Sequence, residues 1–168
     1  MNNDNGFTLV ELLITVSILA ILATVGVPSF QAIIQNSRAT ALTNDLVSAL
    51  NLARSEATKR GIAVSVCATN NNWLNGWRVE PGNNCNANIN DVIRVWPQTP
   101  PNSVILTNIA NLGFDATGAR LDAGAAETSF QVHSQNCSGE RSRILRVSTT
   151  GRVGVERTSC PTQGGDPA

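Results

Sequence analysis

The chain has 168 residues, with 12 basic and 12 acidic side chains and a formal net charge of zero. This balance excludes an overall basic surface of the kind that attracts a polyanion. An apolar N-terminal run leaves about 140 residues, which suffice for one domain with a core.

That run extends from Phe7 to Val27, a stretch of 21 residues that are almost all apolar. About 20 such residues cross a bilayer core of about 30 Å. Glu11 lies near the start, where a carboxylate costs at least a few kcal/mol, and it therefore points to a functional site. A secretory signal does not fit, because residues 1–5 contain no Lys or Arg and the run is too long. A plain membrane anchor fits the length but leaves the acid unexplained.

The helical pattern continues beyond Pro28, which we expect to kink or loosen the helix because it lacks an amide hydrogen. Lys59 and Arg60 suit a helix C-terminus, and Gly61 suits the position after it. The two halves then form one helix of about 53 residues, about 80 Å long. The second half is amphipathic, with one face for a globular core; the apolar positions are Phe30, Ile33, Ile34, Leu42, Leu46, Ala49, Leu50, Ala53 and Ala57.

Beyond Gly61 the apolar period changes from 3.6 to 2, which predicts strands. Turns are expected at 115–118 and 150–151. A helix followed by strands predicts an α+β fold, with antiparallel sheet packed on the helix. The tail, residues 161–168, is predicted to be loose. The expected strands are 62–67, 76–79, 92–96, 103–106, 112–114, 128–133, 144–148 and 152–156.

Four cysteines lie far apart, and none forms a C-x-x-C motif. An even number behind an export-type N-terminus favours disulfides in an oxidising compartment. Three pairings are possible. We predict nearest-neighbour pairing, Cys67 with Cys85 and Cys137 with Cys160, and each closed loop would contribute about 3 kcal/mol in the loop-entropy model.

Residue patterns for catalysis are missing, since the sequence contains no G-x-S-x-G, Walker or H-E-x-x-H motif. The single histidine, His133, has no acid or cysteine near it in sequence, so we interpret it as structural. The tryptophans Trp73, Trp77 and Trp96 could stack on a ligand, but we expect them to fill the core. The loop with Asn83, Asn84, Asn86, Asn88, Asn90 and Asp91 is oxygen-rich but too weakly charged to predict calcium. We therefore predict no enzyme activity, metal or cofactor.

The segment Gly6-Phe7-Thr8-Leu9-Val10-Glu11 after a short polar leader resembles the class III signal of type IV pilins and type II secretion pseudopilins. The resemblance implies that a prepilin peptidase cuts between Gly6 and Phe7 and that Phe7 becomes N-methylated. Pro28 matches a helix-kinking proline of this family. One departure is Asp4, because such leaders usually carry a basic residue.

Cleavage at this site would create an ammonium at Phe7, one helical turn before Glu11. The carboxylate could pair with its own N-terminus or with that of a neighbouring subunit. In lipid or a helix bundle an unpaired acid is penalised and a paired one is tolerated. We therefore predict that Glu11 sets the register between subunits. The alternative is a membrane glutamate that merely extends to the interface.

Residues 46–67 resemble the helix-to-strand passage of the FimT/FimU/GspH group of minor pilins, and segments 75–77, 113–118 and 150–153 resemble later landmarks of that group. The implied architecture is a type IV pilin-like fold. Its predicted parts are a leader (1–6), a transmembrane or filament-core half-helix (7–28), an amphipathic half-helix (29–61), a β-rich head (62–160) and the tail (161–168).

Arginines concentrate near the C-terminus, at Arg141, Arg143, Arg146, Arg152 and Arg157. Some FimT-type pilins bind DNA through a C-terminal Gly-Arg-x-Arg motif. The matching positions here are 151–154, and Gly154 stands where the second arginine would be. The five arginines could still form a phosphate-binding patch. The alternative is a set of solvated strand arginines paired with Glu140 and Glu156.

The resemblance implies a minor pilin of a type IV pilus that acts in pilus initiation or assembly, with DNA binding as an added possibility. The alternative is a GspH-like pseudopilin of a type II secretion system. For this chain the resemblance implies the following partners: other major and minor pilins, prepilin peptidase, the inner-membrane assembly machinery, lipid before assembly, and DNA. The implied location is the inner membrane, with the head in the periplasm, and then the filament.

Overall fold

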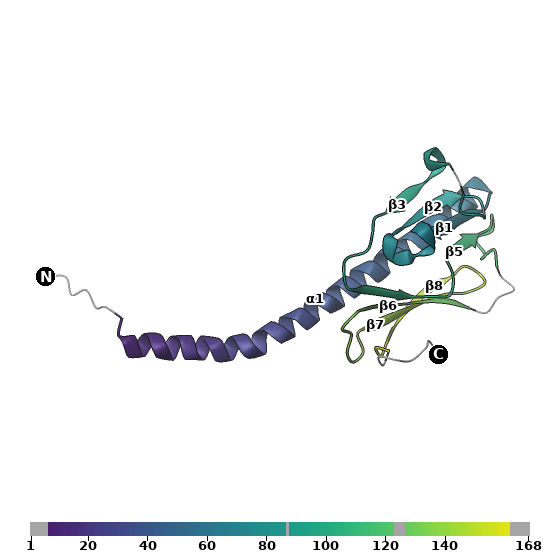
Figure 1. Cartoon of the computed structure of the whole chain (residues 1–168). Helices are drawn as coiled ribbons and strands as arrows, with labels where there is room; N and C mark the ends of the chain where they lie inside the picture. Colours follow the sequence, from purple (N-terminus) through teal and green to yellow (C-terminus); the bar gives the residue numbers. More distant parts are fainter. Residues whose placement is uncertain (1–6, 87, 123–126, 162–168) are drawn as a thin grey trace. The chain divides into compact units, whose positions relative to one another are not determined.

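The computed structural model describes residues 7–86, 88–122 and 127–161. The predicted leader (1–6) and the tail beyond Pro161 lie outside these residues. The chain forms two compact units, Met1–Gln35 and Asn36–Ala168. The second unit, called the head below, contains the two β-sheets and the end of the long helix (Figure 1).

One helix, α1 (Leu9–Arg60), has 52 residues and confirms the predicted long N-terminal helix. It begins directly after Thr8, whose Oγ1 accepts a hydrogen bond from the Glu11 amide at 3.2 Å. It ends at Gly61, which has a φ of +66° and donates its amide to the Ala57 carbonyl. The helix passes through residue 28 without interruption. The kink at Pro28 stays a prediction.

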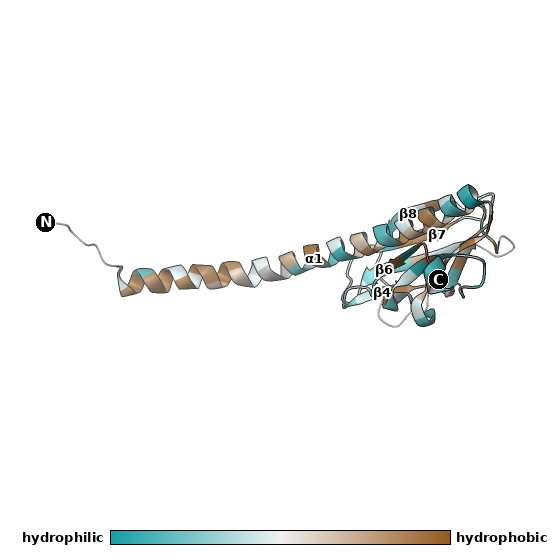
Figure 2. Cartoon of the chain, turned by 90° about the horizontal axis from the view of Figure 1, so that it is seen from above, coloured by the Kyte–Doolittle hydropathy of each residue, from teal (hydrophilic) through white to brown (hydrophobic). Residues whose placement is uncertain are grey.

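The core-facing stripe of α1 begins later than the periodicity indicated. Figure 2 shows the apolar first half of the helix and the alternating polarity of its second half. Phe30 is 64% exposed, Ile33 58% and Ile34 38%, so the prediction that these three residues face a globular core was wrong. Ala39 is the first buried position of α1 among the described residues, and periodicity alone cannot show where burial begins. The buried positions are Ala39, Leu42, Leu46, Ala49, Leu50, Ala53 and Ala57.

Eight strands follow α1 in the described residues, and each lies within two residues of a predicted strand. They form two four-stranded antiparallel sheets, with the orders β3-β2-β1-β5 and β4-β6-β7-β8. The strands are β1 (Val64–Ala68), β2 (Trp77–Pro81), β3 (Arg94–Trp96), β4 (Ser103–Leu106), β5 (Asn111–Phe114), β6 (Thr128–Ser134), β7 (Ser142–Val147) and β8 (Val153–Thr158).

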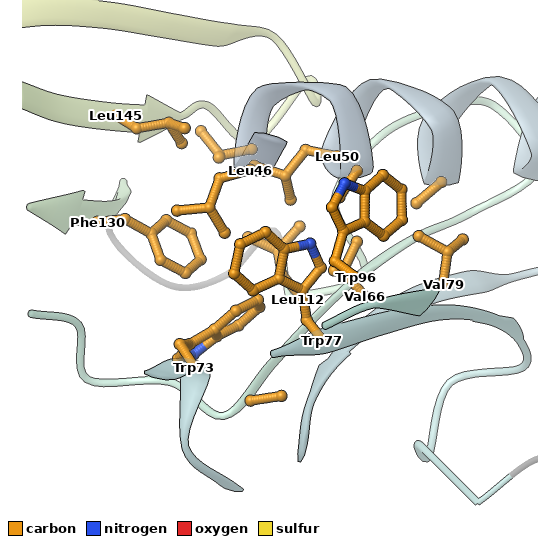
Figure 3. Close-up of a cluster of buried hydrophobic side chains, with 14 of the residues drawn as sticks. Leu46, Leu50, Val66, Trp73, Trp77, Val79, Trp96, Leu112, Phe130 and Leu145 are labelled. Atoms are coloured by element: carbon orange, nitrogen blue, oxygen red, sulfur yellow. The ribbon is translucent and has the colours of Figure 1, made fainter. Parts of the chain in front are cut away.

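The hydrophobic core joins α1 to both sheets. Leu46 and Leu50 are fully buried among side chains from each sheet, including Val66 of β1 and Leu145 of β7 (Figure 3). Burying one such leucine contributes about 1.5–3 kcal/mol. The three tryptophans lie in the same cluster, as predicted, and Trp73 packs edge-on against Phe130.

A buried arginine connects the segment after β5 to the second sheet. Arg120 is 1% exposed, and its Nη1 donates to Thr128 Oγ1 at 2.8 Å and to the Val147 carbonyl at 3.0 Å. Asp122 forms an ion pair with the same guanidinium at 2.5 Å. The buried charge therefore has a carboxylate and two oxygen acceptors, which offset its desolvation.

Candidate assembly helix and arginine surface

The first turn of α1 places Glu11 in a capping position. Thr8 precedes the helix and Glu11 follows three residues later, which is the spacing of a capping box. Thr8 Oγ1 accepts from the Glu11 amide. An acidic side chain in the first turn also interacts favourably with the helix dipole. Thr8 thus caps the helix and Glu11 occupies its first turn; our sequence analysis missed this cap, although the T-x-x-E spacing could have revealed it.

The first half of α1 is exposed wherever the structure describes its side chains. Every described side chain from Phe7 to Thr24 is exposed, and Phe7 itself is 77% exposed. Hydroxyl groups in this half donate to carbonyls one turn earlier, as Thr15 Oγ1 does to Leu12 and Ser17 Oγ to Leu13. The polar groups are thus satisfied locally, and an apolar surface is left for a partner.

Within the described residues, no helix is both long and apolar enough to cross a membrane.

Both predicted disulfides are present. Cys67 bonds with Cys85 and Cys137 with Cys160, with Cα–Cα separations of 5.7 and 5.6 Å. The first links β1 to the loop after β2. The second links the β6–β7 connection to the end of β8. Nearest-neighbour pairing was therefore correct.

The first disulfide lies beside a buried acid. Glu80 is fully buried and forms an ion pair with Arg78, which also donates to the Cys85 carbonyl at 3.1 Å. Cys67, Cys85 and Glu80 are the one group of His, Cys, Asp or Glu side chains in the described residues that are close enough to share a metal ion. Both of its sulfurs are committed to the disulfide, so we interpret the group as structural.

A side chain of α1 joins two turns that are distant in sequence. Arg54 Nε donates to the Gly118 carbonyl at 3.0 Å, and Nη2 donates to the Thr150 carbonyl at 3.2 Å. Gly118 lies in the turn after β5, and Thr150 in the turn between β7 and β8. Sequence analysis predicted both turns and noted them as family landmarks, but it did not predict that they lie together. The structure shows that the two turns lie together at Arg54. We call Arg54, Gly118 and Gly151, the residue after Thr150, the turn clamp.

The five C-terminal arginines do not share one surface. Arg143 is buried and donates to Asn36 and Thr40 of α1. Arg146 lies on the opposite face of β7, because its neighbours Leu145 and Val147 point into the core.

Each of the other arginines has a separate environment. Arg141 donates to Ser138. Arg152 lies exposed at the β7–β8 turn, and Arg157 lies exposed near the end of β8. Of the two predicted acid partners, Glu156 pairs with Arg146 at 3.9 Å, and Glu140 forms no ion pair among the described residues. Glu127, which was not predicted, also pairs with Arg146, at 3.6 Å. The structure therefore separates residues that the sequence grouped together.

His133 lies on β6, and its structural role stays a prediction. It is half-buried, and its Nδ1 lies 2.9 Å from the Ser134 carbonyl oxygen.

Two family models match this chain. The model described as Type II transport protein GspH matches residues 42–151, which is more than half of the chain. The chain belongs to the GspH family. The model described as the prokaryotic N-terminal methylation motif matches residues 1–27. This motif implies a precursor anchored in the membrane.

Solved structures confirm the fold. Two crystal structures of the type IV minor pilin FimU from Pseudomonas aeruginosa are similar to this GspH-family chain. The first has a TM-score of 0.58 and 22% identity, over 75% of this chain and 90% of FimU. The second has a TM-score of 0.54 and 25% identity, over 71% of this chain and 90% of the FimU chain in that structure. A search of curated proteins found no match. The family and fold are those of structural pilin proteins.

Proposed function

We propose that this chain is a minor pilin of a type IV pilus and acts in pilus initiation or assembly. The observation that carries the proposal is the first half of α1, whose described side chains are exposed and mostly apolar. A contiguous apolar surface of this length needs lipid or other apolar helices around it. The N-terminal methylation motif favours both covers in succession, first the membrane and then the filament.

The membrane stage rests on the sequence from Phe7 to Val27, which includes residues whose side chains the structure does not describe. Processing at Gly6 would free the Phe7 amine for methylation. The amine would remain one turn from Glu11, within the helix start that Thr8 caps. Glu11 would then pair with an ammonium of its own chain or of a neighbouring subunit, and this pairing would set the register of packing.

The sharpest test compares Glu11→Ala with the wild type in cells that assemble the filament. We expect normal membrane insertion and processing but a several-fold loss of the subunit from sheared filaments. Thr8→Val is a matched control, because it removes the helix cap and keeps the acid. Equal incorporation of Glu11→Ala and wild type would contradict the register role.

Processing has a separate test. We expect mass spectrometry of the mature protein to show a methylated N-terminal Phe7. Gly6→Ala should be processed better than Gly6→Leu, since the peptidase requires a small residue before the cut. A fully processed Gly6→Leu protein would contradict the proposed cleavage site.

The second candidate function is a pseudopilin of a type II secretion system, which the family model favours. Both candidate functions use the same helix and the same head. They are distinguished by whether the protein is needed for pili or for protein secretion. Deleting the gene should abolish surface pili and leave protein secretion intact if the pilus assignment is right. The reverse result would establish the pseudopilin.

A further inference from the structure

Arg143 is an arginine that is buried in the head and forms no ion pair with a carboxylate among the described residues. Arg143 on β7 is 6% exposed. Its Nη2 donates to Asn36 Oδ1 at 2.9 Å and to Thr40 Oγ1 at 3.3 Å, and its Nη1 donates to the Ser142 carbonyl at 3.2 Å. All three acceptors are neutral, so within the described residues the positive charge is desolvated and has no compensating carboxylate.

A second cation lies directly opposite. Arg143 pairs with Arg157 across the β7–β8 ladder, and partners in an antiparallel pair point to the same face. Like charges in this position destabilise a sheet. The pKa of Arg143 is lowered, first by burial and then by the charge of Arg157. In the part of the chain that the structure describes, neither arginine forms an ion pair.

The acid next to Arg157 points away from both arginines, and Glu140, the nearest acid in sequence to Arg143, forms no ion pair among the described residues. Glu156 precedes Arg157 on β8, so it points to the other face of the sheet, where it pairs with Arg146. The face of β8 that carries Arg157 also exposes Val155. Val155 is 45% exposed, although its cross-strand partner Leu145 is fully buried. β8 is also one of the two edge strands of its sheet.

These three residues form what we call the β8 ledge: the recessed guanidinium of Arg143, and the exposed side chains of Val155 and Arg157. The ledge lies at the end of the head where α1 enters, because Arg143 contacts Asn36, the first residue of the head. It offers one apolar contact beside two cations that have no ion-pair partner in residues 7–86, 88–122 and 127–161. Its chemical complement is an acidic side chain on a protein surface.

We propose that the β8 ledge binds an aspartate or glutamate side chain of the adjoining subunit in the assembled filament. This inference rests on the proposed function. A carboxylate between the guanidinium groups would neutralise the like-charge pair and supply the missing counter-ion. Nucleic acid fits less well, because phosphate binding needs several exposed cations along a surface, and Arg143 is recessed. The ledge therefore acts only in the assembled state and leaves the free subunit under electrostatic repulsion.

The test uses the full chain and the variant Arg157→Gln. In the purified, detergent-solubilised subunit, we expect the unfolding temperature to rise, because the repulsion is removed. In cells, we expect incorporation into filaments to fall about tenfold, because the acid loses a charged partner. Arg152→Gln is the matched control, since Arg152 is exposed at the neighbouring turn and forms no ion pair in the described residues. It should change neither quantity.

The variant Arg157→Glu sharpens the result. It gives Arg143 a carboxylate within the chain, so the unfolding temperature should rise further while incorporation is lost. A lower unfolding temperature for Arg157→Gln, or incorporation equal to the wild type, would overturn the proposal. Absence of the wild type itself from filaments would instead contradict the proposed function.

Crosslinking identifies the occupant directly. A photoreactive residue at position 155 should crosslink to a peptide of the adjoining subunit that contains Asp or Glu. The same residue at position 154, on the opposite face of β8, should not yield that product. A crosslink to nucleic acid, or to a peptide without an acid, would overturn the proposal.

Discussion

Gly151 lies against Gly118 so closely that a β-carbon built on Gly151 would overlap the Gly118 carbonyl oxygen. Both glycines have positive φ, +77° for Gly151 and +81° for Gly118. The same carbonyl accepts the hydrogen bond from Arg54 Nε. The turn clamp thus joins α1, the turn after β5 and the β7–β8 turn at one point.

The variant Gly151→Ala should be strongly destabilising. The added carbon meets backbone atoms rather than a flexible side chain, and alanine is strained at this φ. We expect the free energy of unfolding to fall by about 2 kcal/mol or more, as measured by urea unfolding. Gly154→Ala is the matched control, because nothing lies within 4 Å of its added carbon. Equal effects would show that the contact is not tight in solution.

Replacing Arg54 should release both turns from the helix. Arg54→Ala removes hydrogen bonds to the Gly118 and Thr150 carbonyls. A loss of about 1–3 kcal/mol is expected, and hydrogen exchange at residues 115–118 and 148–151 should quicken. Arg38→Ala, an exposed arginine on the same helix, should leave both measurements unchanged. Unaltered exchange in the two turns would exclude a clamping role for Arg54.

Acidification should weaken the turn that supports the clamp. Hydrogen bonds from the Thr117 hydroxyl and amide, and then from the Ala119 amide, lower the pKa of the Asp115 carboxyl. Because the pKa in the folded state lies below the unfolded value of about 3.9, the stabilisation is complete above about pH 4. It is lost as the pH falls through the lowered pKa.

This pH dependence is measurable by urea unfolding between pH 7 and pH 2. Asp115→Asn should show a smaller loss of stability on acidification than the wild type. Asp45→Asn, at an exposed position on α1, should behave like the wild type. Identical pH profiles for the wild type and Asp115→Asn would show that the Asp115 carboxylate does not cause the loss of stability at low pH.

Removal of either disulfide should lower the free energy of unfolding by a similar amount. The two bonds span 18 and 23 residues, and loops of this size correspond to about 3 kcal/mol each in the loop-entropy model. The double replacements Cys67→Ser with Cys85→Ser, and Cys137→Ser with Cys160→Ser, can be compared by thermal unfolding. Treatment of the wild type with a reductant should reproduce the combined effect. A reductant-insensitive unfolding temperature would contradict this prediction.

Binding of DNA should be weak at physiological salt. The arginines lie on different faces of the sheet, and Arg146 pairs with Glu127 and Glu156. Few phosphates can therefore be neutralised together, and affinity depends steeply on that number. A gel shift with the full chain in detergent, titrated with salt, measures this. Tight binding that disappears in Arg152→Gln would restore the DNA-receptor hypothesis.

The sequence predicted local structure well because its signals were local. The change of period near Gly61 located the end of α1, and alternation located the eight strands. The division into two sheets was not predicted, since pairings such as β1 with β5 depend on contacts distant in sequence. The exposure of Phe30 was missed for the same reason, because periodicity cannot show where the head ends.

Some residues of the candidate site could be predicted from the sequence and others could not. Glu11 stood out because a lone acid in an apolar run is anomalous, and the cysteine pairs were few enough to choose between. The arginines were grouped by nearness in sequence, but side chains alternate along a strand, which separates Arg146 from Arg143. Arg54 carried no signal of its own, since its partners are carbonyl oxygens that any residue could supply.

The core that surrounds Leu46 and Leu50 also constrains when the head can fold. Those leucines are made early in synthesis, but Leu145 and Val147, which complete the same core, are made about a hundred residues later. Pairing over such separations is slow. The nascent helix therefore exposes its apolar stripe during most of translation. Until β7 arrives, the chain depends on its cellular surroundings to avoid aggregation.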